Sequence, residues 1–222
     1  MLREHLIPHG FVTQLYSPPM NHEERALKEI YLTLSERYRY QKFELLSAGQ
    51  GALLKEGEAR SCEIYRDRLV IREQPTQVST GEYFDQVIPI AEEIQRKLNI
   101  PIWVVQQAVL RFLVPFEEPV IPLLQSRLFS IGDDAMGEFG RPVLGMCLRI
   151  EFPPLPEDPS QLQLRIEPYF RNPKRLYLEL SARFLQPVQS LDELRNRLAT
   201  ADEFIKEKAL SFLETTLSRD QS

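Results

Sequence analysis

The last third of the chain alternates apolar and polar residues over three successive segments, 146–152, 162–167 and 176–184. A period of two places successive side chains on opposite faces of a β-sheet. The connections between the segments, PPLPEDPS and RNPK, are rich in turn-forming residues. The pattern therefore predicts a three-stranded antiparallel meander, with one buried face and one face in water.

Charges on the polar face of this meander predict its register. Glu151 opposite Arg165, and Arg149 opposite Glu167, would both pair opposite signs. Arg165 opposite Glu179 would also keep Glu167 away from Glu179 in the second hairpin. Such cross-strand pairs contribute about 0.2–1 kcal/mol each, and like charges placed opposite each other destabilise the sheet. We therefore expect these pairings.

Three segments repeat apolar residues at the spacing of an α-helix: 21–38, 79–99 and 190–217. Ser79 with Glu82, and Ser190 with Glu193, have the spacing of a capping box at a helix start. Pro89 interrupts the second pattern and is expected to kink or break that helix. The long last helix has an apolar stripe that we expect to cover the apolar face of the meander.

Strand-like segments fill most of the first half: FVTQLY (11–16), FELLSAGQGALL (43–54), SCEIYRDRLVIRE (61–73) and IWVVQQAVLRFLVPF (102–116). We expect a bulge or turn at Arg66–Arg68, and a short helix near 119–130. The 102–116 segment is apolar on both faces, which is typical of a central strand. This order of elements predicts an α+β fold with a mainly antiparallel sheet, helices packed on one face and two similar α+β halves.

An acidic, glycine-spaced stretch, FSIGDDAMGEFGRP, separates the predicted halves. Glycine frees the backbone and carboxylates keep it in water, so we interpret 132–141 as a connecting loop. The halves are then 1–131 and 142–222 within one compact unit, with strand structure resuming at Val143 or soon after. The alternative is a divalent-metal site on the oxygen ligands Asp133, Asp134 and Glu138.

Composition excludes several classes of function. The chain has 222 residues, 43% of them hydrophobic, and a net charge of −5. That charge argues against a nucleic-acid partner, because such binding depends on basic contacts to phosphates. No apolar run has the length of a membrane helix, so we expect no membrane partner. The N-terminus lacks the apolar region of a signal peptide, which favours a cytoplasmic protein with both cysteines reduced.

Candidate chemistry is sparse. All three histidines lie within the first 22 residues, and we expect His5 and His9 in an exposed N-terminal segment. No phosphate-binding loop, dinucleotide fingerprint or metal-ligand motif is present. We therefore assign no catalytic residue, no metal ligand and no cofactor. Whether the protein is an enzyme stays open, and the sequence favours a protein that is not one.

Two polar residues on the apolar 102–116 segment are the candidate ligand-binding residues, Arg111 and Gln106. A charge within such a strand must find a partner or face a polar cavity. The alternative for Arg111 is an ion pair with an acid from the 79–99 helix. A second group of polar residues shares one face of the meander: Glu151, Glu167 and Glu179 with Arg149, Arg165 and Arg183. This group could form a ligand site, an oligomer interface or a surface in contact with water.

The later two-thirds of the chain resembles a sporadically distributed prokaryotic family of uncharacterised proteins of about 250 residues. The resemblance lies in SCEIYRDRLVIRE, EYFDQVIPIAEEIQRKLN and VVQQAVLRFLVPF, and in the run from PVLGMCLRIEF to EFIKEKALSFLETTL. Members of that family often carry an Arg and, a few residues later, an Asn on the central strand. Here Leu113 and Val114 stand a few residues after Arg111, and no Asn is present there. The resemblance implies no activity, cofactor or active-site residue.

These observations leave three functional hypotheses. The first is a non-catalytic interaction protein, a homo-oligomer that binds a protein partner in an adaptor- or chaperone-like role. The second is a small-molecule binding domain, with Gln106 and Arg111 orienting a ligand in a cavity between the sheet and the C-terminal helix. The third is a divalent-metal-dependent hydrolase that uses Asp133, Asp134 and Glu138.

Overall fold

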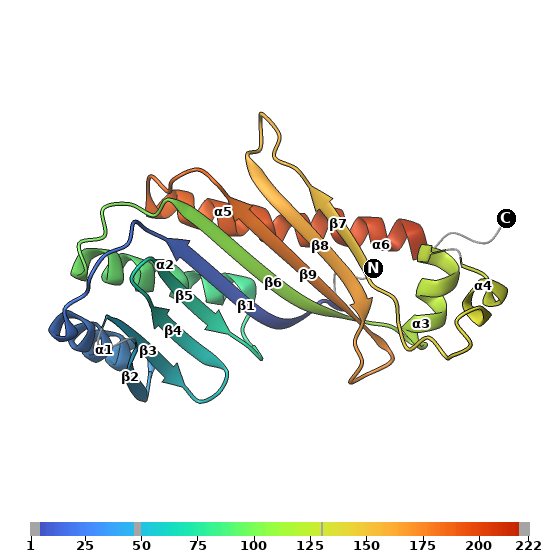
Figure 1. The fold of residues 1–222 in the computed structure, drawn as a ribbon, viewed down its shortest axis with the longest axis horizontal. Coiled ribbons are helices and arrows are strands. Elements are labelled where there is room, and N and C mark those ends of the chain that lie inside the picture. Colours follow the sequence, from blue (N-terminus) through green and yellow to red (C-terminus); the bar gives the residue numbers. More distant parts are fainter. Residues whose placement is uncertain (1–4, 47–49, 130, 218–222) are drawn as a thin grey trace.

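One antiparallel sheet runs through the molecule and contains all the named strands (Figure 1). The structure is a computed structural model that describes residues 5–46, 50–129 and 131–217. The sheet order is β2-β3-β4-β5-β1-β6-β9-β8-β7. The strands are β1 (Ile7–Tyr16), β2 (Lys42–Leu46), β3 (Gly51–Glu56), β4 (Arg60–Ile64), β5 (Arg68–Glu73), β6 (Val105–Pro115), β7 (Leu148–Phe152), β8 (Ser160–Pro168) and β9 (Arg175–Phe184).

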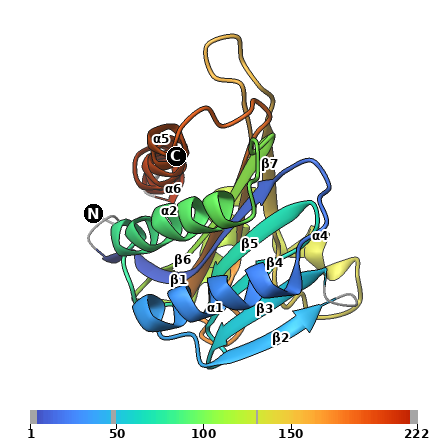
Figure 2. The ribbon, with the colours of Figure 1, turned by 90° about the vertical axis from the view of Figure 1, so that its left-hand side faces the viewer.

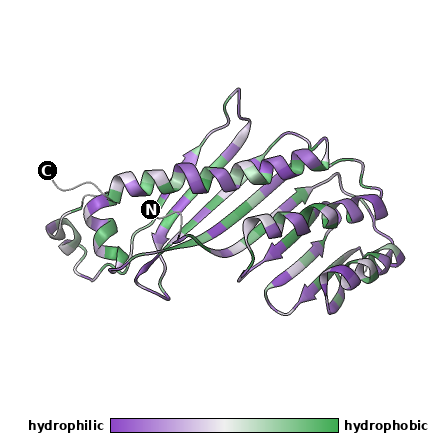
Figure 3. Cartoon of the chain, turned by 180° about the vertical axis from the view of Figure 1, so that it is seen from behind, coloured by the Kyte–Doolittle hydropathy of each residue, from purple (hydrophilic) through white to green (hydrophobic). Residues whose placement is uncertain are grey.

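The principal helices all pack on the same face of this sheet, as the end-on view shows (Figure 2). They are α1 (Glu24–Tyr38), α2 (Thr80–Lys97) and a continuous C-terminal helical segment made of α5 (Leu191–Glu203), the π-helical turn η4 (Phe204–Ala209) and α6 (Leu210–Leu217). Seen from behind, these helices lie in front of the strands (Figure 3). The predicted α+β fold, with helices on one face and a long terminal helix on the meander, is confirmed.

The two halves of the sheet have matching topology. β1 and β6 lie side by side at the centre, and each is followed by helical structure and then by a meander. The last strand of each meander pairs with the strand that precedes the helical structure, β5 with β1 and β9 with β6. Two similar α+β units are therefore present, as predicted, but they begin at β1 and at β6, whereas the predicted first half, 1–131, includes β6. Because β6 pairs with both β1 and β9, one sheet joins the halves, and their boundaries at 131 and 142 stay a prediction.

The first half contains more strands than the pattern predicted. Each of the segments 43–54 and 61–73, predicted as one strand, forms two paired strands. Of the bulge or turn expected at Arg66–Arg68, the structure has the turn, where the Tyr65 amide donates to the Arg68 carbonyl at 2.8 Å. Gly51 explains how closely β3 and β4 pack, since a Cβ there would lie 2.5 Å from the Ile64 carbonyl oxygen. In the segment 61–73, apolar residues on both sides of the turn hid the break.

The predicted register of the C-terminal meander is right in one hairpin and wrong in the other. Arg165 lies opposite Glu179, as predicted, but Arg149 lies opposite Arg165 and not Glu167. A shift of two residues keeps every apolar side chain on the same face, so only small charge terms oppose it. Packing decides instead, because the Phe152 ring meets the Phe204 ring of η4 at 5.3 Å. Arg165 then pairs along its own strand with Glu167, at 2.7 Å.

The helix starts follow the predicted caps. Ser79 and Glu82 form a complete capping box at α2, and the Ser190 side chain accepts from the Glu193 amide at α5. Helix α2 continues through Pro89. Its Tyr83 hydroxyl anchors the helix to the sheet, because it reaches the Ile71 carbonyl at 2.9 Å.

The connection between β6 and β7 is partly helical. The short helix predicted near 119–130 is present as α3 (Val120–Leu123) and the π-helical η3 (Leu124–Phe129). The predicted loop at 132–141 instead contains a helix, α4 (Asp133–Gly137). This helix begins directly after Gly132, whose backbone is extended. The next strand begins at Leu148, later than the expected restart near Val143.

Candidate functional site

The sheet face opposite the helices has an excess of positive side chains, and Figure 1 looks onto it. We call this surface the open face. The strand pairings place nine lysine and arginine side chains there against five glutamates. They are Lys42, Lys55, Arg68, Arg72, Arg111, Arg149, Arg165, Arg175 and Arg183, with Glu44, Glu63, Glu151, Glu167 and Glu179. The whole chain carries a net charge of −5, so the acidic residues that outweigh these basic ones lie elsewhere in the molecule.

A small apolar island lies within this polar surface. Val12, Val70 and Val109 contact each other there and are buried, with Tyr65 packed against them. The Arg68 guanidinium stacks over the Tyr65 ring at 4.7 Å, which is a cation–π geometry. Long polar side chains therefore shield the valines where no described helix does.

Arg111 lies at the centre of the open face in a fixed network. Its Nε donates to Glu179 Oε2 at 2.6 Å, and its Nη1 donates to Gln74 Oε1 at 2.9 Å. The Tyr177 hydroxyl also donates to Glu179 Oε2, at 2.7 Å. Burial, and then the hydrogen bond to Glu179, raise the pKa of the Tyr177 phenol, so it remains a donor at neutral pH.

The partner of Arg111 corrects one prediction. An acid from the 79–99 helix was the expected alternative, but α2 lies on the other face of the sheet. Glu179 of β9 takes that role because it sits directly opposite Arg111 in the β6–β9 register. The pair is half-buried, with 18% of the Arg111 side chain and 16% of the Glu179 side chain exposed.

Gly10 makes room for the third member of this network. A Cβ at Gly10 would lie 2.8 Å from Gln74 Cγ, well inside contact distance. Only glycine therefore lets Gln74 cross β1 and reach Arg111. The register of β1 on β6 shifts between Pro8 and Gly10, so His9 is the extra residue of a β-bulge. Bulges change the direction of a side chain and occur often beside functional sites.

The His9 ring lies among arginines and tyrosines from three other parts of the chain. Tyr169 and Tyr177 meet it edge-on, with centroids 5.3 and 6.0 Å away. Burial lowers the pKa of His9, and the positive charges of Arg111, Arg171 and Arg175 lower it further. We call these six residues the His9 cluster: His9, Arg111, Tyr169, Arg171, Arg175 and Tyr177.

Two members of the His9 cluster have no carboxylate partner among the residues that the structure describes. Arg171 is exposed at the tip of the β8–β9 hairpin, and Arg175 is half-buried at the start of β9. Within the described ranges, neither forms an ion pair. His9 was expected in an exposed N-terminal segment, and that prediction is wrong, since β1 holds it half-buried at the sheet centre.

The second predicted ligand-binding residue, Gln106, lies on the opposite face from Arg111. The two are five positions apart on one strand, and an odd separation sends side chains to opposite faces. Gln106 is fully buried under α5, where its Nε2 donates to the Leu194 carbonyl at 3.3 Å. Its Oε1 has no partner among the described residues. The structure therefore does not bring Gln106 and Arg111 together.

The predicted polar constellation on the meander does share one face. Glu151, Glu167 and Glu179 point to the open face with Arg149, Arg165 and Arg183.

The metal ligands proposed from the sequence lie at α4. Asp133 is the first residue of this helix, and Asp134 and Glu138 are exposed. Among the described residues, no three side chains of ligand type gather as a metal site would need.

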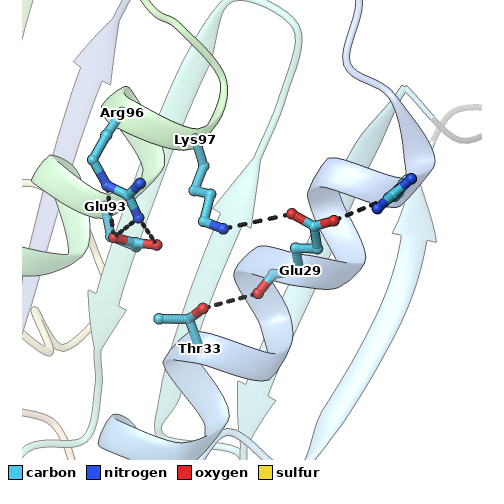
Figure 4. Close-up of polar contacts among 6 residues, drawn as sticks. Glu29, Thr33, Glu93, Arg96 and Lys97 are labelled. Carbon is cyan, nitrogen blue, oxygen red and sulfur yellow. Dashed lines mark hydrogen bonds and ion pairs between the residues drawn. The ribbon is translucent and has the colours of Figure 1, made fainter.

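The surface between α1 and α2 has polar contacts that hold the helices together (Figure 4). Lys97 of α2 reaches Glu29 of α1 at 3.5 Å, and Glu29 also accepts from Arg25 at 3.0 Å. The bond from Arg25, and then the one from Lys97, lower the pKa of Glu29. Arg96 pairs with Glu93 on the same helix. Each charge already has a protein partner, which is typical of a structural contact.

A cavity of about 650 Å³ opens beside the loop after β5. Its charged lining is Glu56, Arg60 and Glu73. Arg60 donates to both carboxylates, with a distance of 2.8 Å to Glu73, whose side chain is 8% exposed. These groups satisfy one another, so this cavity offers a ligand fewer uncommitted polar groups than the His9 cluster does.

Comparison with known proteins adds no family. No family model matches the chain, and no curated protein matches it. One solved structure that was compared is the Pct1 RNA triphosphatase of S. pombe in complex with the Spt5 CTD. It is 11% identical over 98% of this chain and 86% of that chain, with a TM-score of 0.12. That likeness is too low to support an argument about fold or function.

Within the part of the chain that the structure describes, no helix combines the length and apolar character needed to cross a membrane.

Proposed function

We propose that this chain is a non-catalytic interaction protein whose open face binds an acidic surface of a protein partner. The observation that supports the proposal is the excess of basic side chains on the open face. The described strands place nine basic and five acidic side chains on the open face, although the chain as a whole is negative. Complementary charge speeds association and selects among partners.

The open face is also ordered before any partner arrives. Arg111 is held by Glu179 and Gln74, and Arg165 is held by Glu167 while its guanidinium lies 5.8 Å from the Tyr177 ring. Side chains that are already fixed lose less conformational entropy on binding. Arginine and tyrosine are enriched at protein interfaces, where they combine apolar contact with hydrogen bonding.

Charge also argues for a different protein as the occupant. Two copies placed open face to open face would bring like charges together, which disfavours that dimer. A partner of opposite charge avoids the repulsion. Self-association through this face, and binding of nucleic acid, are therefore outcomes that the experiment must separate from binding of an acidic protein.

The test uses poly-L-glutamate as the acidic polypeptide and a single-stranded RNA of matched charge, each titrated by fluorescence anisotropy. We expect the polypeptide to bind, and rising salt to weaken that binding. The Arg149→Glu/Arg183→Glu variant reverses two exposed charges on the open face and should weaken binding about tenfold. The matched control, Arg37→Glu/Lys208→Glu, reverses two exposed charges elsewhere and should bind like the parent protein.

Three results would contradict the proposal. The first is equal loss of binding in the control and in the open-face variant. The second is tighter binding of the RNA than of the polypeptide at the same ionic strength. The third is a dimer in sedimentation velocity that the open-face variant dissociates, because the occupant would then be a second copy of this chain.

A further inference from the structure

The His9 cluster gathers positive charge in a way that folding does not require. Arg111, Arg171 and Arg175 come from β6 and the β8–β9 hairpin, and all three act on the same histidine. Only Arg111 has a carboxylate partner among the described residues. Like charges brought together oppose folding, so their gathering calls for an anion that the chain itself does not supply.

The backbone directs these side chains toward one another. The bulge at His9 turns a residue of β1 toward the open face, across β6. The Tyr169 and Tyr177 rings stand edge-on to the His9 ring and limit its positions. Residues 160 positions apart in the sequence thereby form one side-chain cluster, whose orientation the sheet fixes.

The donors of this cluster suit a tetrahedral anion. Guanidinium groups donate in a planar fork that matches the oxygens of phosphate and carboxylate. Arg111 uses one N–H toward Glu179 and one toward Gln74, and a guanidinium has further N–H groups. With Arg171, Arg175 and a protonated His9, the cluster offers more positive charge than a single carboxylate balances. A phosphate group carries about −1.5 to −2 near neutral pH and has three acceptor oxygens.

We propose that the His9 cluster binds the phosphate group of a phosphorylated side chain on the protein partner. This inference rests on the proposed function of the open face, because it names the chemistry of one subsite within that face. Arg171 and Arg175 contact the phosphate oxygens, Arg111 supplies the fixed centre of the subsite, and His9 takes up a proton as the anion enters.

The groups that face His9 set how its protonation responds to binding. Arg111 from β6, Arg171 and Arg175 from the β8–β9 hairpin disfavour the protonated ring, while Glu179 of β9 is already engaged by Arg111 and Tyr177. A bound dianion opposes the three arginines. The phosphate should therefore raise the pKa of His9 from its lowered value.

The experiment follows the His9 imidazole by NMR, which is practical because the chain has only three histidines. His9→Gln assigns the signal. The probes are a glycine-flanked phosphoserine peptide, its unphosphorylated form and inorganic phosphate, all at constant ionic strength set with chloride. We expect the phosphopeptide to shift the His9 signal and raise its pKa, and the unphosphorylated peptide to do neither.

Matched variants locate the effect. Arg171→Gln/Arg175→Gln should weaken phosphopeptide binding about tenfold or more, as expected for lost charge-assisted hydrogen bonds. The matched control, Arg37→Gln/Lys208→Gln, removes two exposed charges that lie outside the open face and should bind like the parent protein. Thermal unfolding of each variant checks that the fold is intact, and Arg171 and Arg175 are not part of the core.

The outcomes separate this inference from the proposed function. Equal binding of the phosphorylated and unphosphorylated peptides would overturn the phosphate subsite. Equal loss of binding in Arg37→Gln/Lys208→Gln and in Arg171→Gln/Arg175→Gln would overturn it as well. Binding of inorganic phosphate without the phosphopeptide would overturn the assignment to a phosphorylated side chain. If poly-L-glutamate binds but the phosphopeptide does not, the proposed function stands and the subsite fails; the reverse result removes the function and leaves the subsite.

Discussion

The two faces of the sheet are built from the same strands and differ in what holds their side chains in place. On the helix-covered face, leucines and other apolar residues pack against α1, α2 and α5–α6, and Leu110, Leu178 and Leu180 are fully buried. On the open face, long polar side chains bury one another through ion pairs such as Arg111–Glu179. One face is thus stabilised mainly by packing, the other by lateral polar contacts.

This difference teaches that an uncovered sheet face is not simply a solvated one. Leu113 lies on the open face and is only 3% exposed. It belongs neither to the core under the helices nor to the apolar island of valines on the open face. Its cross-strand neighbours are Tyr177 and Ile7. Polar and aromatic side chains can therefore exclude water from a strand surface without a helix, and the same side chains remain available to a partner.

The largest expected effect comes from two matched substitutions on β6, each of which creates a cavity. Leu110→Ala, on the covered face, should lower the free energy of unfolding by about 4–5 kcal/mol, because rigid packing leaves a cavity that cannot close. Leu113→Ala, on the open face, should cost about 2–3 kcal/mol, since its flexible neighbours can collapse into the space. Urea denaturation followed by circular dichroism measures both. Equal losses would show that the two faces are equally rigid.

The next effect tests the lateral contacts of the open face. Glu179→Leu removes the acceptor shared by Arg111 and Tyr177. We expect a loss of about 1–3 kcal/mol, because two half-buried donors are left without their partner. Glu151→Leu is the matched control, since Glu151 is exposed on the same face, and it should change stability by less than about 0.5 kcal/mol. A similar small change in both variants would mean that the network contributes no stability.

The covered face could be predicted from the sequence to a large extent. Alternation with a period of two identified the meander strands, and helical spacing identified α1, α2 and the terminal helix, because burial of one face imposes these periods. The register of β7 could not be predicted, because a slip of two residues preserves the apolar pattern. The charges of Arg149 and Glu151 are too weak to overrule how Phe152 packs against Phe204.

The candidate site could be predicted only in part. Arg111 stood out as a charge on an apolar strand, but its partner depends on which strand lies beside β6. The excess of basic residues was hidden, because sequence neighbours such as Arg72 and Glu73 point to opposite faces. The role of His9 depends on a bulge and on contacts with Tyr169. Glycine within a strand suggests a bulge or a close approach, but the predicted strand began at Phe11, so Gly10 gave no such signal.

A smaller effect should follow from filling the space beside that bulge. Gly10→Ala places a Cβ against Gln74 and should break the Gln74–Arg111 hydrogen bond. We expect a loss of about 1 kcal/mol in urea denaturation, the usual contribution of one such bond. Gln74→Ala breaks the same bond without the clash. Combining both changes should therefore cost less than their sum, whereas additive losses would show that Gly10 has no connection to Arg111.

The smallest effect is the pH dependence that His9 gives to the open face. The pKa of His9 is lowered in the folded protein, so between that lowered value and about 6.5, the usual value for histidine, the unfolded chain binds the extra proton. The contribution of His9 to stability is thus fully present above that window and is lost as the pH falls through it. Melting temperatures of the parent protein and His9→Gln, measured from pH 7.5 downward, test this. As the pH falls, the melting temperature of the parent protein should decrease more than that of His9→Gln.

Arg171→Gln/Arg175→Gln should reduce the pH dependence, because fewer positive charges then oppose protonation of His9. A profile that is the same in all three proteins would show that these arginines do not act on His9, and the open face would then be no more sensitive to pH than the covered one.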